Sequence, residues 1–166
     1  MLKQHYKAAT YKAKASIGYL VKRAHALMHD NMDSAFAEQG FTFMQWVVMM
    51  YLRDGIALNP KDICGQFRHD SGALTRVIDQ LAERGLLERV RGLVDRRTVD
   101  LHLTPAGRAA VEGLIPTVVG KLNTALADFS SAEVKEFTRL LNKLNDAMQL
   151  NLERAASDTD VAAPKE

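Results

Sequence analysis

LTRVIDQLAERGLL (residues 74–87) and DRRTVDLHLT (residues 95–104) are the two stretches of sequence that decide the fold. Apolar residues in the first recur at three- and four-residue steps, which predicts a helix with one buried face that ends at Gly85. After Gly85 the period changes to alternation, which predicts strands over residues 86–90 and 98–103. The polar segment 91–97 between them contains three arginines and is typical of a hairpin tip.

A second short helix is predicted directly before this one. Asn59 can cap a helix, Pro60 suits its first position because no N–H is needed there, and Asp62 favours the positive helix end. This helix is expected to end near Phe67, and Asp70 is expected to cap the next. Two short helices joined by a tight turn and followed by a basic hairpin outline a winged helix-turn-helix.

Longer helices flank this unit on both sides. The pattern predicts amphipathic helices over residues 10–38 and from the cap at Thr42 to about Tyr51. A further helix opens at Thr104 and is expected to kink at Pro116, and Ser130 begins a capping box ahead of a narrow apolar seam that ends at Met148. We expect a mainly α fold with a small β wing, in which residues 40–103 form the DNA-binding domain, residues 1–38 and 104–156 form dimerisation helices, and residues 157–166 form a disordered tail.

The second helix of a helix-turn-helix places its N-terminal residues against base edges in the major groove. Small residues there allow close approach, a threonine hydroxyl can bond a phosphate, and an arginine can bond guanine or a phosphate. The residues expected to contact DNA from this helix are Ser71, Gly72, Ala73, Thr75 and Arg76.

The hairpin tip adds four expected DNA contacts. Asp95 and Arg97 lie two apart in an extended segment, so both can project to one side and pair. A guanidinium fixed in this way enters a narrow, electronegative minor groove at a lower ordering cost. Arg91 and Arg96 are expected near phosphates. A surface ion pair without function is the simpler alternative for Asp95 and Arg97.

The charge of the chain is unevenly distributed. Residues 1–29 carry six Lys or Arg and no acidic residue, residues 68–97 carry seven Arg against five acidic residues, and residues 112–166 carry six basic against nine acidic residues. This distribution predicts that one side of the protein faces a polyanion and that another side has a different use. Cys64 is the single cysteine, so no internal disulfide forms, and without a signal-type segment or a spanning apolar run the cytoplasm is the expected compartment.

Residues 74–87, residues 95–104 and the following Pro105 and Gly107 together resemble the MarR (multiple antibiotic resistance regulator) family of winged helix-turn-helix regulators. The resemblance implies a homodimer formed by the first and last helices and bound to an imperfectly palindromic operator in double-stranded DNA. By this resemblance Thr75 and Arg76 belong to the recognition helix, and Asp95 and Arg97 to the wing. Members of the family often have a long polar side chain where this chain has Ser71 and another polar residue where it has Gly72, so base specificity is expected to depend more on Arg76, the wing and DNA shape.

Members of the family commonly bind small aromatic acids between their helices. The resemblance implies a repressor, or less often an activator, released by a small aromatic effector. A methionine-rich wall suits flat apolar ligands, although aromatic and methionine residues at helical spacing also form ordinary core. The candidate ligand residues are His25, Met28, His29, Trp46, Met49 and Met50.

Three alternatives stay open. The winged helix can be a protein-interaction module whose basic wing docks an acidic partner, and Cys64 can make the regulator redox-responsive. His25 and His29 lie four apart on one helix face, but two ligands do not make a metal site, so no metal or cofactor is expected. The sequence contains no glycine-rich phosphate loop, metalloprotease motif or nucleophile elbow, and we expect no enzymatic activity.

Overall fold

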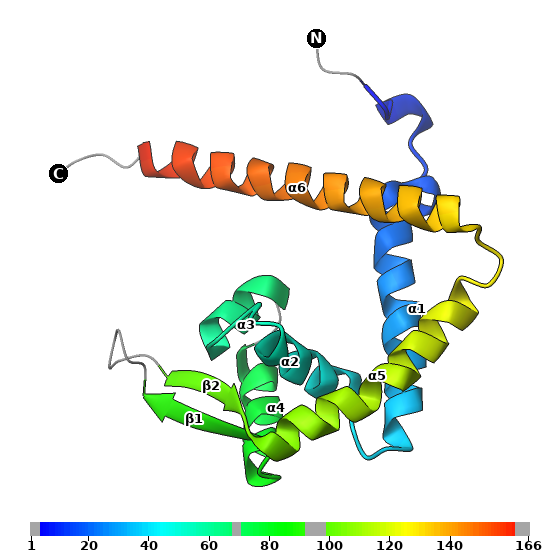
Figure 1. The fold of residues 1–166 in the computed structure, drawn as a ribbon. Helices are drawn as coiled ribbons and strands as arrows, with labels where there is room; N and C mark the ends of the chain where they lie inside the picture. Colours follow the sequence, from blue (N-terminus) through cyan, green and yellow to red (C-terminus); the bar gives the residue numbers. More distant parts are fainter. Residues whose placement is uncertain (1–3, 68–70, 92–98, 162–166) are drawn as a thin grey trace. The chain divides into compact units, whose positions relative to one another are not determined.

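The computed structural model describes residues 4–67, 71–91 and 99–161, and Figure 1 shows their helices and strands. They divide into two compact units, Met1–Lys121 and Leu122–Glu166. Two short 3-10 turns, Ala8–Thr10 and Ala13–Ala15, precede α1 (Ile17–Ala37), α2 (Phe43–Arg53), α3 (Pro60–Phe67), α4 (Ser71–Glu83), β1 (Leu87–Arg91), β2 (Val99–Leu103), α5 (Pro105–Ala125) and α6 (Ser131–Val161). The predicted fold class, mainly α with a small antiparallel β sheet, is confirmed.

Helix α1 starts seven residues later than the apolar pattern predicts. Ser16 has an extended backbone, and its hydroxyl accepts a hydrogen bond from the Tyr19 N–H at 3.3 Å, which caps the helix there. The preceding residues form the two 3-10 turns, and the Tyr6 hydroxyl accepts the Ile17 N–H at 2.9 Å. The apolar residues after residue 17 do form one helix, as predicted.

The caps of the next helices are those that the sequence predicts. Thr42 and Gln45 form a capping box at the start of α2. The Asn59 side chain accepts the Asp62 N–H at 2.9 Å, and α3 begins at Pro60. Asp70, the predicted cap of α4, lies outside the described residues.

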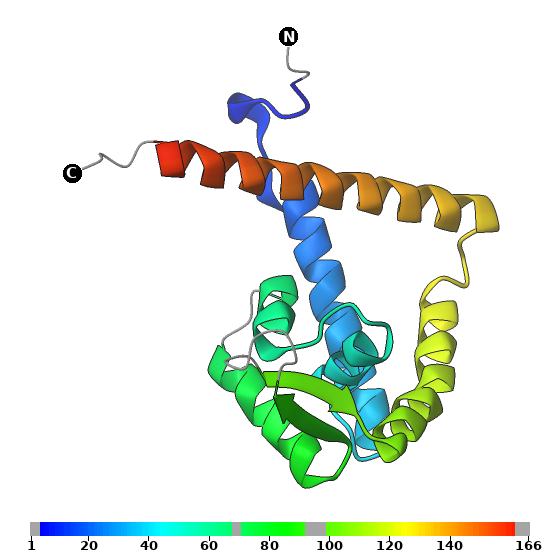
Figure 2. The same cartoon turned by 60° about the vertical axis from the view of Figure 1, so that its left-hand side comes forward.

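Gly85 turns the chain from α4 into the wing. Its φ of +67° is a conformation that favours glycine, and the Leu86 N–H bonds the Leu81 carbonyl at 2.9 Å. Strands β1 and β2 then pair antiparallel, with Leu87 opposite Leu103 and Arg91 opposite Val99. Figure 2 shows the two strands side by side, next to α4.

Strand β2 is also bonded on its other edge. The Leu101 N–H donates to the carbonyl of Leu58, in the loop before α3, at 2.7 Å. The loop that leads into the helix-turn-helix is therefore fixed to the wing strand at this bond.

The core of the first unit takes side chains from every helix from α1 to α5 and from both strands. Burying each large apolar side chain contributes about 1.5–3 kcal/mol before opposing entropy is counted. The largest fully buried side chains are Phe36, Val48, Met49, Ile63, Ile78, Leu81, Leu101, Val111 and Leu114.

Helix α5 is fixed at its start and continues across Pro116 as one helix. The Thr104 hydroxyl accepts the Gly107 N–H at 3.0 Å and donates to the Gly85 carbonyl at 2.7 Å. Thr104, where the sequence predicts this helix to open, therefore caps α5, and the same side chain joins α5 to the turn that ends α4.

The second unit contains α6, which begins with the predicted capping box. The Ser130 N–H donates to Glu133 at 2.9 Å, and the Glu133 N–H donates to the Ser130 hydroxyl at 3.3 Å. The sequence predicts a disordered tail from residue 157, whereas α6 extends to Val161, so this boundary differs by five residues. Residues 162–166 lie outside the described residues.

Candidate functional site

The two faces of α4 differ sharply in burial. Leu74, Ile78 and Leu81 face the core and are at most 4% exposed. Gly72, Ala73, Thr75 and Arg76, four of the predicted DNA contacts, are all exposed. The helix therefore presents small and polar residues near its N-terminus while its apolar side anchors it.

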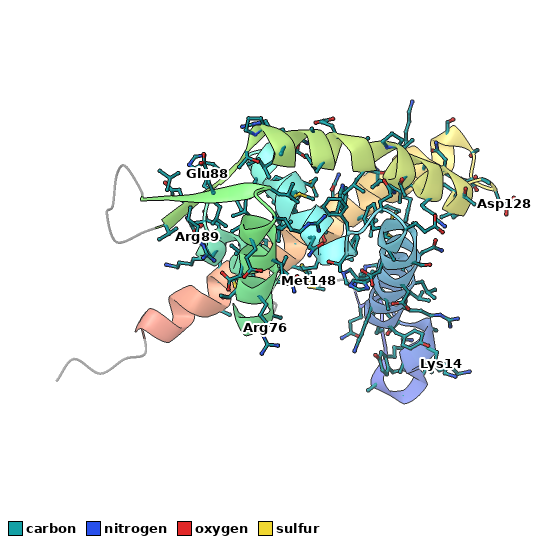
Figure 3. The ribbon with its side chains drawn as sticks, turned by 90° about the horizontal axis from the view of Figure 1, so that it is seen from below. Lys14, Arg76, Glu88, Arg89, Asp128 and Met148 are labelled. Atoms are coloured by element: carbon teal, nitrogen blue, oxygen red, sulfur yellow. The ribbon has the colours of Figure 1, made fainter. Side chains whose placement is uncertain are left out.

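Arg76 supplies an exposed positive charge on this surface. Figure 3 shows its side chain projecting from α4 away from the neighbouring helices. A guanidinium in this position can form bidentate hydrogen bonds with guanine or contact a phosphate. Ser71 is the first residue of α4, and its side chain lies outside the described part of the structure.

The structure describes only the base of the wing that carries the other predicted DNA contacts. Arg91 ends β1, opposite Val99 at the start of β2, and its side chain is not described. Asp95, Arg96 and Arg97 belong to segment 92–98, which lies outside the described residues. Their predicted roles remain predictions.

An ion pair joins α4 to the wing. The Arg89 guanidinium of β1 lies 2.5 Å from a carboxylate oxygen of Asp79, and both side chains are about 45% exposed. In Figure 3 Arg89 lies on the α4 side of β1, and Glu88 lies on the other side of the strand. Sequence reasoning missed this pair because the two residues are ten apart and meet only through the turn at Gly85.

An aromatic cluster lies where α1 meets α2, and we call it the aromatic corner. It contains His29, Phe36, Phe43 and Trp46, with ring centroids 5.1 Å apart for His29 and Phe43, 5.8 Å for Phe43 and Trp46, and 5.7 Å for Phe36 and Trp46. The Trp46 Nε1–H is buried and has no hydrogen-bond partner among the described residues. A buried donor without an acceptor is unusual, because leaving it unsatisfied costs about 1–3 kcal/mol.

The structure brings only some of the predicted ligand residues together. His29 and Trp46 both contact Phe43 in the aromatic corner. Met49 is fully buried in the core, Met50 is half-buried, and His25 and Met28 are exposed on α1. Phe43 and Asp33 were missed. The Asp33 carboxylate accepts the Phe43 N–H at 2.8 Å and so joins α1 to the first residue of α2.

The remaining candidates do not gather into a site. Cys64 is half-buried on α3. Among the described residues, no three His, Cys, Asp or Glu side chains lie close enough together to hold a metal ion. In the same part of the chain, no helix has both the length and the apolar character that a membrane span requires.

Known proteins share this architecture. The family model described as "MarR family" matches residues 41–99. The "HTH-type transcriptional repressor YetL" of Bacillus subtilis is 24% identical over 125 residues, which cover 74% of this chain and 75% of that protein.

Two solved structures show the same fold over most of the chain. One concerns the regulation of DNA binding of Bordetella bronchiseptica BpsR by 6-hydroxynicotinic acid; it is 29% identical with a TM-score of 0.70 and covers 82% of this chain and 97% of that one. The other is a cysteine-to-serine mutant of MarR from E. coli complexed with operator DNA, 25% identical with a TM-score of 0.67, covering 77% of this chain and 92% of that one.

Proposed function

Because this chain belongs to the MarR family of DNA-binding transcription regulators, we propose that it acts as a homodimeric repressor that a small aromatic acid releases from its operator. The observation that carries the proposal is the surface of α4, where exposed Gly72, Ala73, Thr75 and Arg76 stand opposite an anchored apolar side. The Asp79–Arg89 pair supports it, since it joins the recognition helix to the wing.

Two surfaces favour the homodimer. Helix α1 has a row of apolar side chains that are 42–58% exposed, namely Ile17, Leu20, Val21, Leu27 and Met28. Within α6, Phe137, Leu140 and Met148 are 48–58% exposed. Contiguous exposed apolar surface of this kind marks an interaction site, and two-fold pairing is the commonest arrangement. A dimer bound to successive major grooves needs its recognition helices about 34–36 Å apart.

The aromatic corner supports the proposal that a small aromatic acid is the effector. Its rings offer flat apolar surface, and the buried Trp46 Nε1–H can donate to a carboxylate or hydroxyl oxygen. His29, which is 40% exposed, lies at the solvent side of the cluster. The DNA binding of BpsR is regulated by an aromatic acid of this class, 6-hydroxynicotinic acid. An effector bound here would act by favouring a dimer whose recognition helices no longer match the operator.

Binding of the protein to the DNA upstream of its own gene tests the proposed function as a regulator. We would measure the dissociation constant for that DNA and for a scrambled duplex at several salt concentrations. Specific binding should exceed binding to the scrambled duplex by roughly 10³-fold or more. Arg76→Ala should weaken specific binding by about 1–3 kcal/mol if the guanidinium reads a base, whereas Arg108→Ala, which removes an exposed arginine of α5, should have little effect.

Arg97→Ala extends the test to the predicted wing. A loss of affinity for both duplexes with a smaller salt slope would identify a phosphate contact, and a loss confined to the specific duplex would identify readout of base or groove shape. Equal affinity of the unmodified protein for both duplexes, unaltered by either arginine change, would contradict the proposed function.

A further inference from the structure

Gln45 is a buried amide whose polar groups are shared between two helices. The residue is 6% exposed. Its side-chain oxygen accepts the Thr42 N–H at 3.1 Å, which completes the capping box of α2, and also accepts a guanidinium N–H of Arg84 at 3.3 Å. Its side-chain nitrogen donates to Gln80 of α4 at 3.1 Å. The group that starts α2 therefore also holds α4.

Arg84, directly after α4, is held from three sides. Besides Gln45, its guanidinium donates to the Gly40 carbonyl at 3.0 Å and lies 4.2 Å from the centre of the Phe41 ring. Gly40 and Phe41 lie between α1 and α2, and Gln45 lies in the first turn of α2. We call the set Gly40, Phe41, Gln45, Gln80 and Arg84 the corner clamp.

We propose that Gln45 and Arg84 are positioning residues for DNA recognition, which set the placement of α4 without touching DNA. The proposal rests on the function proposed above. Buried Leu74, Ile78 and Leu81 set which side of α4 faces the core, but their apolar contact is not directional in the way that a hydrogen bond is. The hydrogen bonds of the corner clamp are directional and lie at the far end of the helix from its DNA-contacting residues.

The distance along α4 explains why the corner clamp matters for readout. Arg76 precedes Arg84 by eight residues, about 12 Å along a helix that rises 1.5 Å per residue. A small tilt or rotation at the end near Arg84 is carried to Arg76 because the helix between them is rigid. Base readout needs a fixed geometry, whereas phosphate contacts tolerate displacement, so loosening the corner clamp should reduce specificity more than general affinity.

The corner clamp also adjoins the aromatic corner. Gln45 directly precedes Trp46, and the capping box that uses Gln45 begins one residue before Phe43, whose N–H bonds Asp33. A ligand that moves the first turn of α2 therefore moves the Gln45 amide that holds α4. This provides a route from the proposed effector to the recognition helix.

Arg84→Lys tests the proposal because it keeps the charge and loses the planar fork. We expect the preference for upstream over scrambled DNA to fall by about tenfold, the scale of a lost charge-assisted hydrogen bond, with the affinity for scrambled DNA and the salt slope unchanged. Gln80→Ala should give a smaller fall in this preference. Because Gln80 is exposed, this variant should keep its core intact, and it serves as the test if Arg84→Lys fails to fold. Arg108→Lys, at an exposed site on α5, is the matched control.

A second measurement does not depend on DNA. Hydrogen exchange of the amides over residues 78–83 in the free protein should be faster in Arg84→Lys and Gln80→Ala, and unchanged in Arg108→Lys. If the salt slope of Arg84→Met is smaller than that of the unmodified protein by about one, Arg84 contacts DNA and the proposal is overturned. Unchanged exchange, or faster exchange with an unchanged preference for upstream DNA, would also overturn it. If the unmodified protein shows no such preference, the proposed function fails, and with it the positioning role in DNA recognition, while exchange alone still shows whether the clamp holds α4.

Discussion

Gly107 of α5 lies directly against the backbone carbonyl of Leu86, so that a Cβ at position 107 would overlap the carbonyl oxygen. The same carbonyl accepts the Thr104 N–H at 3.1 Å. The turn that leaves α4 is therefore packed against the first turn of α5. This contact is the physical reason for a glycine two residues after Pro105.

Gly107→Ala should destabilise the protein by about 2–3 kcal/mol, because the obstructing atom belongs to the backbone and cannot move aside cheaply. Urea unfolding followed by circular dichroism measures this change. Gly113→Ala is the control in the same helix, since nothing lies within 4 Å of a Cβ there. It should stabilise the protein by about 0.5–1 kcal/mol through helix propensity. Equal effects of the two substitutions would show that Gly107 is not closely packed.

The Asp79–Arg89 pair should contribute little to stability although it joins α4 to β1. Both side chains are almost half exposed, so the coupling free energy in a double-mutant cycle should be about 0.5 kcal/mol and should fall in 1 M salt. Unfolding of Asp79→Ala, Arg89→Ala and the double variant gives this value. Glu88→Ala, beside Arg89 on the strand, should show no coupling to Asp79. A coupling above about 2 kcal/mol would mean that the pair is more shielded from solvent than its exposure indicates.

Charge introduced into the apolar row of α1 should break the proposed dimer. Leu20 and Leu27 are 52% and 58% exposed in the isolated chain, so glutamate at either position costs the single chain little and costs an apolar interface several kcal/mol. Light scattering on a size-exclusion column should report a monomer for the double variant Leu20→Glu with Leu27→Glu. Ala26→Glu lies about a third of a turn away from both leucines and should leave the dimer intact. A dimer that survives the double variant would place the interface elsewhere.

The single tryptophan of the chain makes the aromatic corner directly observable. Trp46 is the only tryptophan, so its fluorescence reports on this site alone. Saturating 6-hydroxynicotinate should change its emission, and His29→Ala should weaken that binding because His29 packs against Phe43. His25→Ala removes an exposed histidine one turn earlier and should leave binding unaltered. Release of DNA by the acid with no change in Trp46 emission would exclude the aromatic corner as the effector site.

The Arg53–Asp54 pair predicts a small dependence of stability on pH. Its hydrogen bond from Arg53 holds the pKa of the Asp54 carboxyl below the ordinary value of 3.8. A carboxyl whose pKa is lowered in the folded state stabilises the protein at pH values above its ordinary pKa. This stabilisation is lost as the pH falls through the lowered pKa. Because the Asp54 side chain is 38% exposed, Asp54→Asn should cost about 0.5 kcal/mol or less at pH 7. Unfolding at pH 7 and pH 3 should show the difference shrinking at the lower pH, and a constant difference would rule out this linkage.

Local features of the sequence predicted the helix-turn-helix well. Asn59, Thr104 and Gly85 act within three or four residues of their own positions, and the structure places each in its predicted role. The start of α1 was placed too early because the cap at Ser16, where the helix begins, was not recognised. Met49 was predicted to line a ligand site and is fully buried in the core, a distinction that depends on packing against other elements.

The contacts that sequence reasoning missed join different elements of the fold. Gln45 and Arg84 are separated by 39 positions, and neither shows by its type or spacing that it meets the other. A glutamine three residues after Thr42 predicts only a capping box. Its second partner becomes visible only when α2 and α4 are packed together.

The bond between Leu101 and Leu58 has a consequence for how the protein behaves when molecules crowd along a promoter. An exposed strand edge is a template for pairing with another chain, and small antiparallel ribbons are prone to such stacking. Here the central N–H of the outer strand already has an acceptor from its own chain, at 2.7 Å. The Leu101 N–H is therefore not available to pair with a strand of a neighbouring copy.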